Sequence, residues 1–257
     1  MSMEILEFGN PEDRKLLLIH GFESPYQIWE EYIRHFSKSF RVIVPVLPGH
    51  DPARDEDFES FESCVRELED HCLARYGKKI FAVYGMSMGG VVAAILWENG
   101  ILEIEKLIME SSPLLGYGPV MSRLLIKQYL SITHKAQVRD RKTVRKAVNS
   151  MVTEDKLDSF MALLDHISDT TIENYIRGIG KHRLPDSLNR PETELHYLYG
   201  GHMSEFLFRS TARFLRKNYP AANVVCLEGR GHCEDALLHP DRHILTLAEI
   251  LKPAGAG

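Results

Sequence analysis

Apolar residues along this chain fall into short continuous runs separated by amphipathic stretches. In the first half of the chain the runs lie at 15–20, 41–46, 79–85 and 104–110. Continuous apolar runs of this length are typical of strands buried on both faces of a parallel sheet. Helix-like segments lie between them at 25–38, 58–76 and 88–99. Strands that alternate with helices predict an α/β domain with a mostly parallel sheet.

From about 119 to 182 this alternation stops and helical periodicity replaces it. Apolar residues recur there every three or four positions, for example at Leu125, Tyr129 and Ile132, as on one face of a helix. The segment 184–194, rich in Pro, Asp and Asn, ends the helical block. The alternation then resumes, with strands expected at 194–200 and 223–229 and helices at 204–218 and 240–251. We expect one α/β core, residues 1–113 and 190–257, interrupted by an all-helical insertion at 114–189.

A serine between glycines stands where a predicted strand meets a predicted helix. Gly85-Met86-Ser87-Met88-Gly89 has the pattern G-x-S-x-G. A sharp strand-to-helix turn strains the central residue, and the flanking glycines let strand and helix approach closely. The turn exposes the Ser87 hydroxyl at the carboxyl end of the strand, where open α/β sheets bind ligands. Met88 would begin the helix, and its N–H would be placed to stabilise an oxyanion. An incidental serine in a Gly-rich turn is the alternative, which the position of the motif disfavours.

A serine hydroxyl needs a base before it can act as a nucleophile. The chain has 12 histidines, and His232 follows the last predicted strand in a Gly-flanked loop, at the same sheet edge as Ser87. His20 also ends a strand, but it precedes Gly21 and Phe22, and the Phe22 N–H is a candidate second oxyanion donor. We interpret His20 as a structural histidine of that loop. His50 closes another edge loop, where stabilising a turn is the simpler role.

Four motifs together resemble the α/β-hydrolase superfamily. They are "LIHGF", "VLPGHD", "YGMSMGG" and "GRGHCE", and they follow one another in that family's order and spacing. The resemblance implies a central, mostly parallel sheet with helices on both faces and a helical cap inserted after strand six. It also implies Ser87 as the nucleophile, His232 as the base, and the N–H groups of Met88 and Phe22 as the oxyanion hole. A serine nucleophile argues against the branches that use aspartate, the dehalogenases and epoxide hydrolases.

The third member of the triad departs from the family pattern. An aspartate usually lies a few residues beyond a Tyr-Gly pair, but here Met203 follows Tyr199-Gly200 at that distance. Glu205 is the nearest carboxylate, and its extra methylene lengthens its reach. Its alternative role is to interact with the first turn of the following helix. Glu110, at the end of the fourth predicted strand, is the second candidate acid. The third possibility is a Ser-His dyad with no carboxylate.

Composition limits the classes of partner. The 257 residues are 44% hydrophobic and 26% charged, with a net charge of −5, which argues against nucleic acid as the main partner. No apolar run approaches the roughly 20 residues of a membrane span, and the N-terminus lacks the pattern of a secretory signal. The four cysteines have no CxxC spacing, so reduced thiols and a cytoplasmic location are expected. Neither a cofactor motif nor a metal motif is present, and we predict neither group.

These features predict a serine hydrolase of small carboxylic esters. Met86, Trp29 and Tyr117 are expected to line a mostly apolar substrate pocket. The segment 123–146 carries eight basic residues against one acidic residue, Asp140, which indicates either a solvated helix face or a site for an anionic substrate or acidic partner. A ligand-binding signalling protein on the same scaffold, with slow or vestigial hydrolysis, is the alternative function. The sequence gives no oligomeric state.

Overall fold

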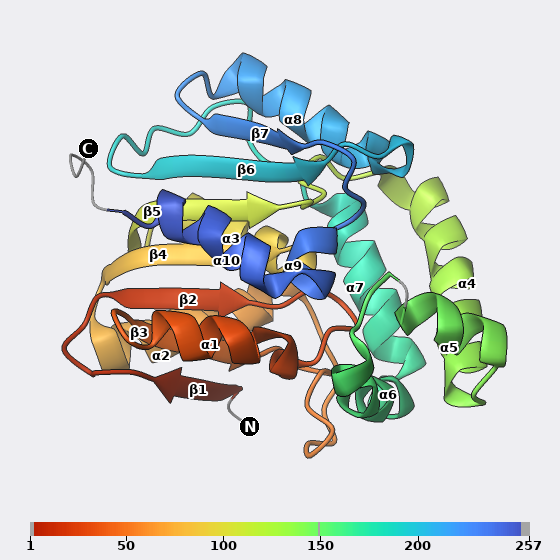
Figure 1. Cartoon of the computed structure of the whole chain (residues 1–257). Helices are drawn as coiled ribbons and strands as arrows, with labels where there is room; N and C mark the ends of the chain where they lie inside the picture. The colour runs from red at the N-terminus through yellow and green to blue at the C-terminus, as the bar shows by residue number, and fades with distance from the viewer. Residues whose placement is uncertain (1–2, 149, 253–257) are drawn as a thin grey trace.

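A seven-stranded sheet lies at the centre of the computed structural model, which describes residues 3–148 and 150–252 (Figure 1). Its strands lie in the order β1-β3-β2-β4-β5-β6-β7. β2 to β7 are mutually parallel, and β1 pairs antiparallel with β3. This confirms the predicted α/β class with a mostly parallel sheet. The strands are β1 (Glu4–Phe8), β2 (Lys15–Ile19), β3 (Arg41–Val46), β4 (Lys79–Met86), β5 (Glu103–Glu110), β6 (Glu194–Gly200) and β7 (Asn223–Leu227).

Helices cover both faces of the sheet because successive strand residues point to opposite sides. Leu16 and Leu18 face one apolar layer, whereas Leu17 and Ile19 face the other. The first layer is completed by α1 (Glu30–Phe36), α9 (Glu234–Leu238) and α10 (Pro240–Ile250), and the second by α2 (Phe61–Tyr76), α3 (Met88–Asn99) and α8 (Phe206–Asn218). Single-turn 3₁₀ helices occur at Tyr26–Trp29, Glu154–Lys156 and Met203–Glu205. The two helical layers hold the strands rigidly in place, and with them the ends of the strands where the loops begin.

Further helices lie between β5 and β6 in the chain and gather beyond the carboxyl ends of the parallel strands (Figure 1). They are α4 (Gly118–Gln137), α5 (Arg141–Val148), α6 (Leu157–His166) and α7 (Asp169–Lys181). α6 packs against α4 around a small apolar cluster of its own, which includes Phe160 and Leu164. Ile172 and Ile176 of α7 instead join the main core. We refer to α4–α7 as the cap helices; the domain boundaries at 114 and 189 stay a prediction.

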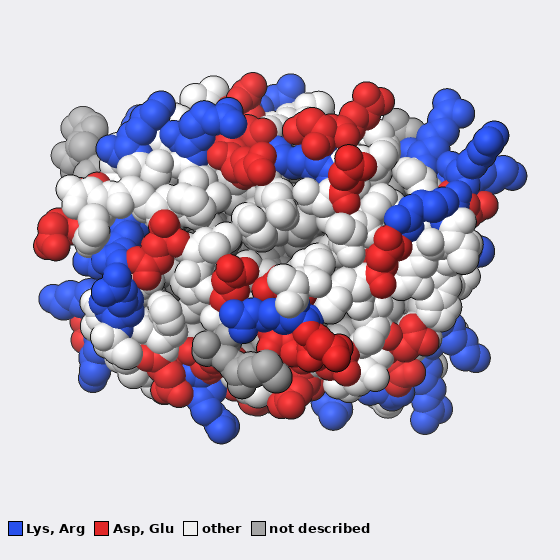
Figure 2. Space-filling view, turned by 90° about the horizontal axis from the view of Figure 1, so that it is seen from below, with Lys and Arg blue, Asp and Glu red and all other residues white. Residues whose placement is uncertain are grey.

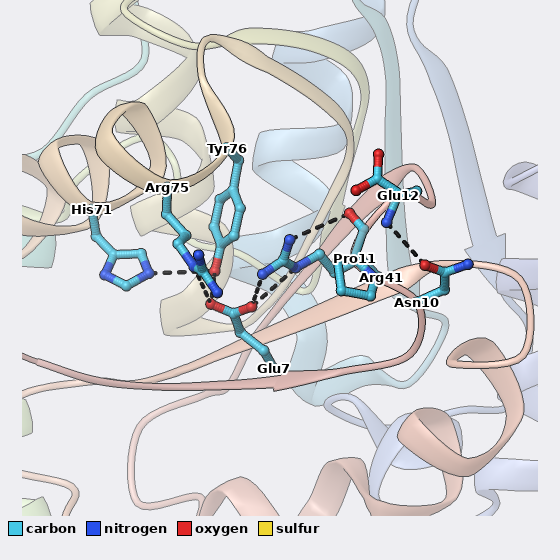
Figure 3. A network of polar contacts seen from close by, with 8 residues as sticks. All are labelled: Glu7, Asn10, Pro11, Glu12, Arg41, His71, Arg75 and Tyr76. Atoms are coloured by element: carbon cyan, nitrogen blue, oxygen red, sulfur yellow. Dashed lines mark hydrogen bonds and ion pairs between the residues drawn. The ribbon is translucent and has the colours of Figure 1, made fainter.

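The first strand and the short helix α9 have no counterpart in the sequence prediction. β1 is an edge strand whose residues are all half-buried, so it lacks the continuous apolar run of the inner strands. Polar contacts of Glu7 hold it in place (Figure 3): the Tyr76 hydroxyl donates to Glu7 at 2.6 Å, and Arg41 Nε donates at 3.0 Å. Arg75 adds an ion pair at 3.4 Å. Long-range contacts from α2 and β3 therefore stabilise this strand, and local sequence does not reveal them.

Candidate active site

Ser87 occupies a strained turn between β4 and α3. Its φ is 52° and its ψ is −108°, a conformation that a non-glycine residue adopts at an energetic cost. Its backbone N–H donates to the Glu110 carbonyl at 2.7 Å. The motif glycines are required by contact: a Cβ on Gly89 would lie 2.1 Å from the Ile19 carbonyl oxygen, and one on Gly85 would lie 2.2 Å from the Gly89 carbonyl oxygen. Close packing of β4, α3 and β2 thus holds the Ser87 hydroxyl at the carboxyl edge.

His232 meets Ser87 at this edge. The loop after β7 carries it, and its Nε2 lies 3.0 Å from Ser87 Oγ, which is within hydrogen-bond reach. The Phe208 ring of α8 stacks on the imidazole, with ring centroids 4.8 Å apart. The imidazole is 41% exposed, so solvent reaches the side chain that would exchange protons.

Glu205 lies on the opposite side of the same imidazole. It ends the 3₁₀ turn Met203–Glu205 and is buried, and its Oε2 lies 3.5 Å from His232 Nδ1. That separation is longer than a good N–H···O hydrogen bond, and this Oε2 atom has no hydrogen-bond partner. Ser87 Oγ contacts the other ring nitrogen of His232. The structure therefore brings Ser87, His232 and Glu205 together in one row.

Glu110, the second candidate acid, is engaged elsewhere. Its Oε2 lies 2.6 Å from His243 Nε2 on α10 and accepts a 2.7 Å hydrogen bond from the Tyr84 hydroxyl. Burial alone would raise the pKa of Glu110, but the ion pair with His243 and the two hydrogen bonds hold it below its ordinary value. The side chains of Glu110 and His243 are each 1% exposed. Glu110 thus forms a buried pair with a different histidine.

The loop after β2 is fixed by two neutral histidines. His20 Nε2 accepts the Leu47 N–H at 3.0 Å, and its Nδ1 lies 2.8 Å from the Gly21 carbonyl. Burial lowers the pKa of His20 to about 4 and that of His50 to about 3, so both rings are neutral near pH 7. The loop carries Phe22, whose ring stacks on Tyr175 of α7 with centroids 4.1 Å apart. Met88 begins α3 beside Ser87.

An apolar cavity of about 160 Å³ opens above Ser87. It is lined by Ser87, His232, Phe22, Met86 and Tyr117 together with side chains of α4, α7 and α8, among them Leu125, Tyr129, Tyr175, Ile176, Ile179, Leu207 and Phe208. Two of the three residues expected to contact substrate, Met86 and Tyr117, therefore lie on its wall. A larger hollow of about 650 Å³, lined by Arg14, Lys79 and Glu103 among others, lies at the amino ends of the strands, away from Ser87.

Trp29 is not among the residues that line the cavity, so its expected contact with substrate needs correction. It is fully buried, and its ring packs edge-on against Tyr32 and Tyr84. The 3₁₀ turn Tyr26–Trp29 directs the indole into the layer between the sheet and α1. Conversely, Tyr175 lines the cavity but was not among the residues expected there. Its spacing from Ile172 and Ile179 places it on the same face of the helix, so the periodicity of this segment could have identified it.

No group of three or more His, Cys, Asp or Glu side chains within residues 3–148 and 150–252 is arranged to hold a metal ion. Two carboxylate–imidazole pairs, Glu205–His232 and Glu110–His243, lie at the carboxyl edge.

Comparison with known proteins supplies the family. The model of the alpha/beta hydrolase family matches residues 16–244. A pimeloyl-[acyl-carrier protein] methyl ester esterase of Legionella pneumophila (strain Corby) is 23% identical over 258 residues, covering 98% of this chain and 100% of that protein. The protein of the same name from Nitrosomonas europaea is 29% identical over 111 residues, covering only 43% of this chain and 41% of that protein.

Solved structures agree at the level of the fold. An alpha/beta hydrolase family protein from Desulfitobacterium hafniense superposes with a TM-score of 0.77 at 19% identity, covering 97% of this chain and 100% of that one. A thermophilic esterase from Thermogutta terrifontis gives a TM-score of 0.70 at 17% identity, covering 97% and 92%. Since the family model runs from Leu16 in β2 to Ile244 in α10 and includes the turn at Ser87 and the loop of His232, the chain belongs to the alpha/beta hydrolase family.

Proposed function

We propose that this protein is a serine esterase that hydrolyses small carboxylic esters through Ser87, His232 and Glu205. The observation that carries the proposal is the 3.0 Å separation of Ser87 Oγ and His232 Nε2 at an apolar cavity. Relatives named as methyl ester esterases support an ester substrate. The cavity of about 160 Å³ is smaller than the roughly 300–1,000 Å³ of pockets that enclose drug-sized ligands, which favours a short acyl group.

The mechanism follows from the order of contacts. His232 Nε2 takes the proton of Ser87 Oγ as the oxygen attacks the ester carbonyl. The N–H groups of Met88 and Phe22 stabilise the oxyanion, and the Glu205 carboxylate stabilises the imidazolium. His232 then protonates the leaving alcohol. In the second half of the cycle His232 takes a proton from water, which attacks the acyl carbonyl. His232 then returns that proton to Ser87 Oγ as the acyl bond breaks, which releases the acid and restores the enzyme.

Replacement of Ser87 tests this proposal. Ser87→Ala should lower hydrolysis of a short aryl ester by at least about 10³-fold and abolish labelling by a fluorophosphonate. Ser131→Ala, at an exposed position of α4, is the matched control and should keep both activities. The ligand-binding alternative predicts slow labelling of Ser87 together with tight binding of an uncleaved ligand. Undiminished hydrolysis by Ser87→Ala would exclude the serine mechanism.

A more specific proposal for the substrate is an acyl ester carried by an acidic carrier protein. The relatives' names specify an ester on an acyl-carrier protein. On α5 of this chain, Arg141, Lys142, Arg145 and Lys146 are all exposed. Lys and Arg side chains gather at the end of the molecule that the cap helices occupy (right-hand end of Figure 2). Met151, just beyond α5, lines the cavity, so a carrier bound at α5 would lie close to its wall.

Charge reversal on α5 separates this substrate from a free ester. The double variant Arg145→Glu/Lys146→Glu should raise KM for a carrier-linked methyl ester by about tenfold or more at low salt, because charged rims steer association. KM for the free methyl ester should stay unchanged. Lys217→Glu, at an exposed position of α8, is the control. Equal KM values for the carrier-linked ester in all three proteins would rule out a docking role for α5.

Two observations bear on location. No helix in the described part of the chain combines the length and apolarity needed to cross a bilayer. All four cysteines are free thiols, which suits a reducing compartment. We propose a cytoplasmic location on that basis.

A further inference from the structure

A buried acidic residue sits next to the proposed oxyanion donor Phe22. Glu23 is 4% exposed, and its φ of 52° is positive, which is uncommon for a non-glycine residue. Its backbone N–H donates to His50 Nε2 at 3.3 Å. The backbone at Glu23 thus continues directly from the N–H that would contact substrate, and any movement of Glu23 moves that donor.

The Glu23 side chain extends from its loop and contacts Thr133 on α4, one of the cap helices. Thr133 Oγ1 lies 2.6 Å from Glu23 Oε1 and 2.9 Å from the Tyr129 carbonyl oxygen. A hydroxyl has a single hydrogen, so Thr133 donates to only one of these two acceptors at a time. A protonated Glu23 satisfies both contacts, because its own O–H donates to Thr133 Oγ1 while Thr133 donates to Tyr129. The geometry therefore suits the carboxylic acid better than the carboxylate.

The groups that face Glu23 offer no positive charge. They are His50 from the loop after β3, Tyr129 and Thr133 from α4, and Tyr175 from α7. His50 is neutral, with its pKa lowered to about 3 by burial, and also by His20 and by His166 of α6. Within the described residues Glu23 has no ion-pair partner. Burial raises the pKa of Glu23 to about 7, against the hydrogen bond from Thr133, which lowers it.

We propose that Glu23 is a positioning residue whose protonated carboxyl ties the oxyanion loop to cap helix α4 through Thr133. Ionisation places an uncompensated charge at a dry interface, and the loop and helix separate to hydrate it. The Phe22 N–H then loses its fixed position, and α4 loses one of its contacts with the core. A single proton would thus couple closure of the cap to completion of the oxyanion hole. The inference rests on the proposed esterase function for its catalytic part.

The pH profile of Glu23→Gln tests the coupling. The glutamine amide donates to Thr133 as the carboxylic acid does, but it does not ionise. In the native protein kcat/KM should fall above about pH 7, by a factor approaching about tenfold per pH unit, mainly through kcat. Glu23→Gln should lack this alkaline decline. Glu192→Gln, at an exposed position before β6, should keep it. A Glu23→Gln profile that superimposes on the native one would overturn the proposal.

Variants at Thr133 keep the test informative if Glu23→Gln fails to fold. Thr133→Val preserves the shape but removes the hydroxyl, so kcat should fall severalfold at pH 6 with KM little changed. Thr133→Ser should restore it. A Thr133→Val protein with native kcat at pH 6 contradicts the proposal.

A structural readout separates this inference from the esterase proposal. Hydrogen exchange of the α4 amides should become faster in the native protein between pH 6 and pH 8, beyond the intrinsic pH effect, and not in Glu23→Gln. This result is expected even if the comparison of the native protein with Ser87→Ala refutes the esterase proposal. Equal exchange in both proteins, with Ser87-dependent hydrolysis intact, refutes the role of Glu23 and leaves the esterase proposal standing.

Discussion

Replacement of Glu205 by Gln is the sharpest test of the proposed acid. The substitution keeps the shape of the side chain but removes the charge that would face the imidazolium of His232. At the 3.5 Å separation of Glu205 Oε2 and His232 Nδ1, two unit charges attract by about 5 kcal/mol at an effective dielectric constant near 20, and by about 1 kcal/mol in bulk water. Because Glu205 is buried while His232 is 41% exposed, the actual value lies between these limits.

An intermediate interaction of about 3–4 kcal/mol corresponds to a loss in kcat of about 10²- to 10³-fold. This is smaller than the roughly 10⁴-fold effect of neutralising the acid in the best-studied triad, as the longer contact and the solvent access suggest. KM should change little, since Glu205 does not line the cavity. The assay is steady-state hydrolysis of a short aryl ester, with single-turnover acylation measured by stopped flow to isolate the chemical step.

The competing assignment supplies the control. Glu110→Gln removes a carboxylate at the same sheet edge that pairs with His243, so it should lower stability and leave kcat per folded molecule within a few fold. If Glu205→Gln keeps kcat within about threefold of the native value while Glu110→Gln loses activity without unfolding, the reasoning from geometry is refuted. The catalytic acid would then be Glu110.

Four further substitutions test other features of the site. His243→Ala leaves the Glu110 carboxylate buried and unpaired, so the free energy of unfolding in urea should fall by about 3–5 kcal/mol; a loss under 1 kcal/mol would disprove a charged pair. Gly89→Ala places a Cβ 2.1 Å from the Ile19 carbonyl oxygen and should destabilise by about 1–3 kcal/mol or more, with a lower kcat because α3 shifts away from β2; a native melting temperature would contradict this. Trp29→Phe should lower stability by on the order of 2 kcal/mol and leave KM unchanged, whereas Tyr117→Ala should change the preference for acyl length. A changed KM in Trp29→Phe would return Trp29 to the substrate site.

The sequence predicts the inner part of this fold well and its edges poorly. The strands β2, β3, β4, β5 and β6 agree with the predicted runs to within one residue at each end, because a strand buried on both faces must be apolar throughout. The edge strand β1 has no such requirement, and its contacts with Tyr76 and Arg41 come from distant segments. The predicted strand 223–229 is two residues too long. β7 ends at Leu227, before Gly229, whose φ is 70°.

Within the site, the sequence locates the residues that local backbone geometry requires. Ser87 is recognisable because its turn needs glycines at fixed distances, and His232 because it follows a strand in a Gly-flanked loop. Trp29 was misplaced because an apolar aromatic residue looks the same in a core and in a pocket. The link between Glu23 and Thr133 joins positions 110 residues apart in sequence, and no local pattern indicates it. Such contacts become visible only once the cap helices are placed over the sheet.

Solvent exposure and contact with Ser87, rather than the separation between carboxylate and imidazole, indicate which of the two pairs takes part in catalysis. Glu110 and His243 are closer, at 2.6 Å, but both side chains are 1% exposed and neither lines the cavity. A histidine held in that pair has no route by which to take a proton from substrate and return it. Glu205 and His232 are farther apart, at 3.5 Å, yet the imidazole is partly exposed and its other nitrogen contacts Ser87. A general base must gain and lose a proton in each cycle, so the looser pair is the one suited to chemistry, and the tighter pair holds α10 against β5 beneath it.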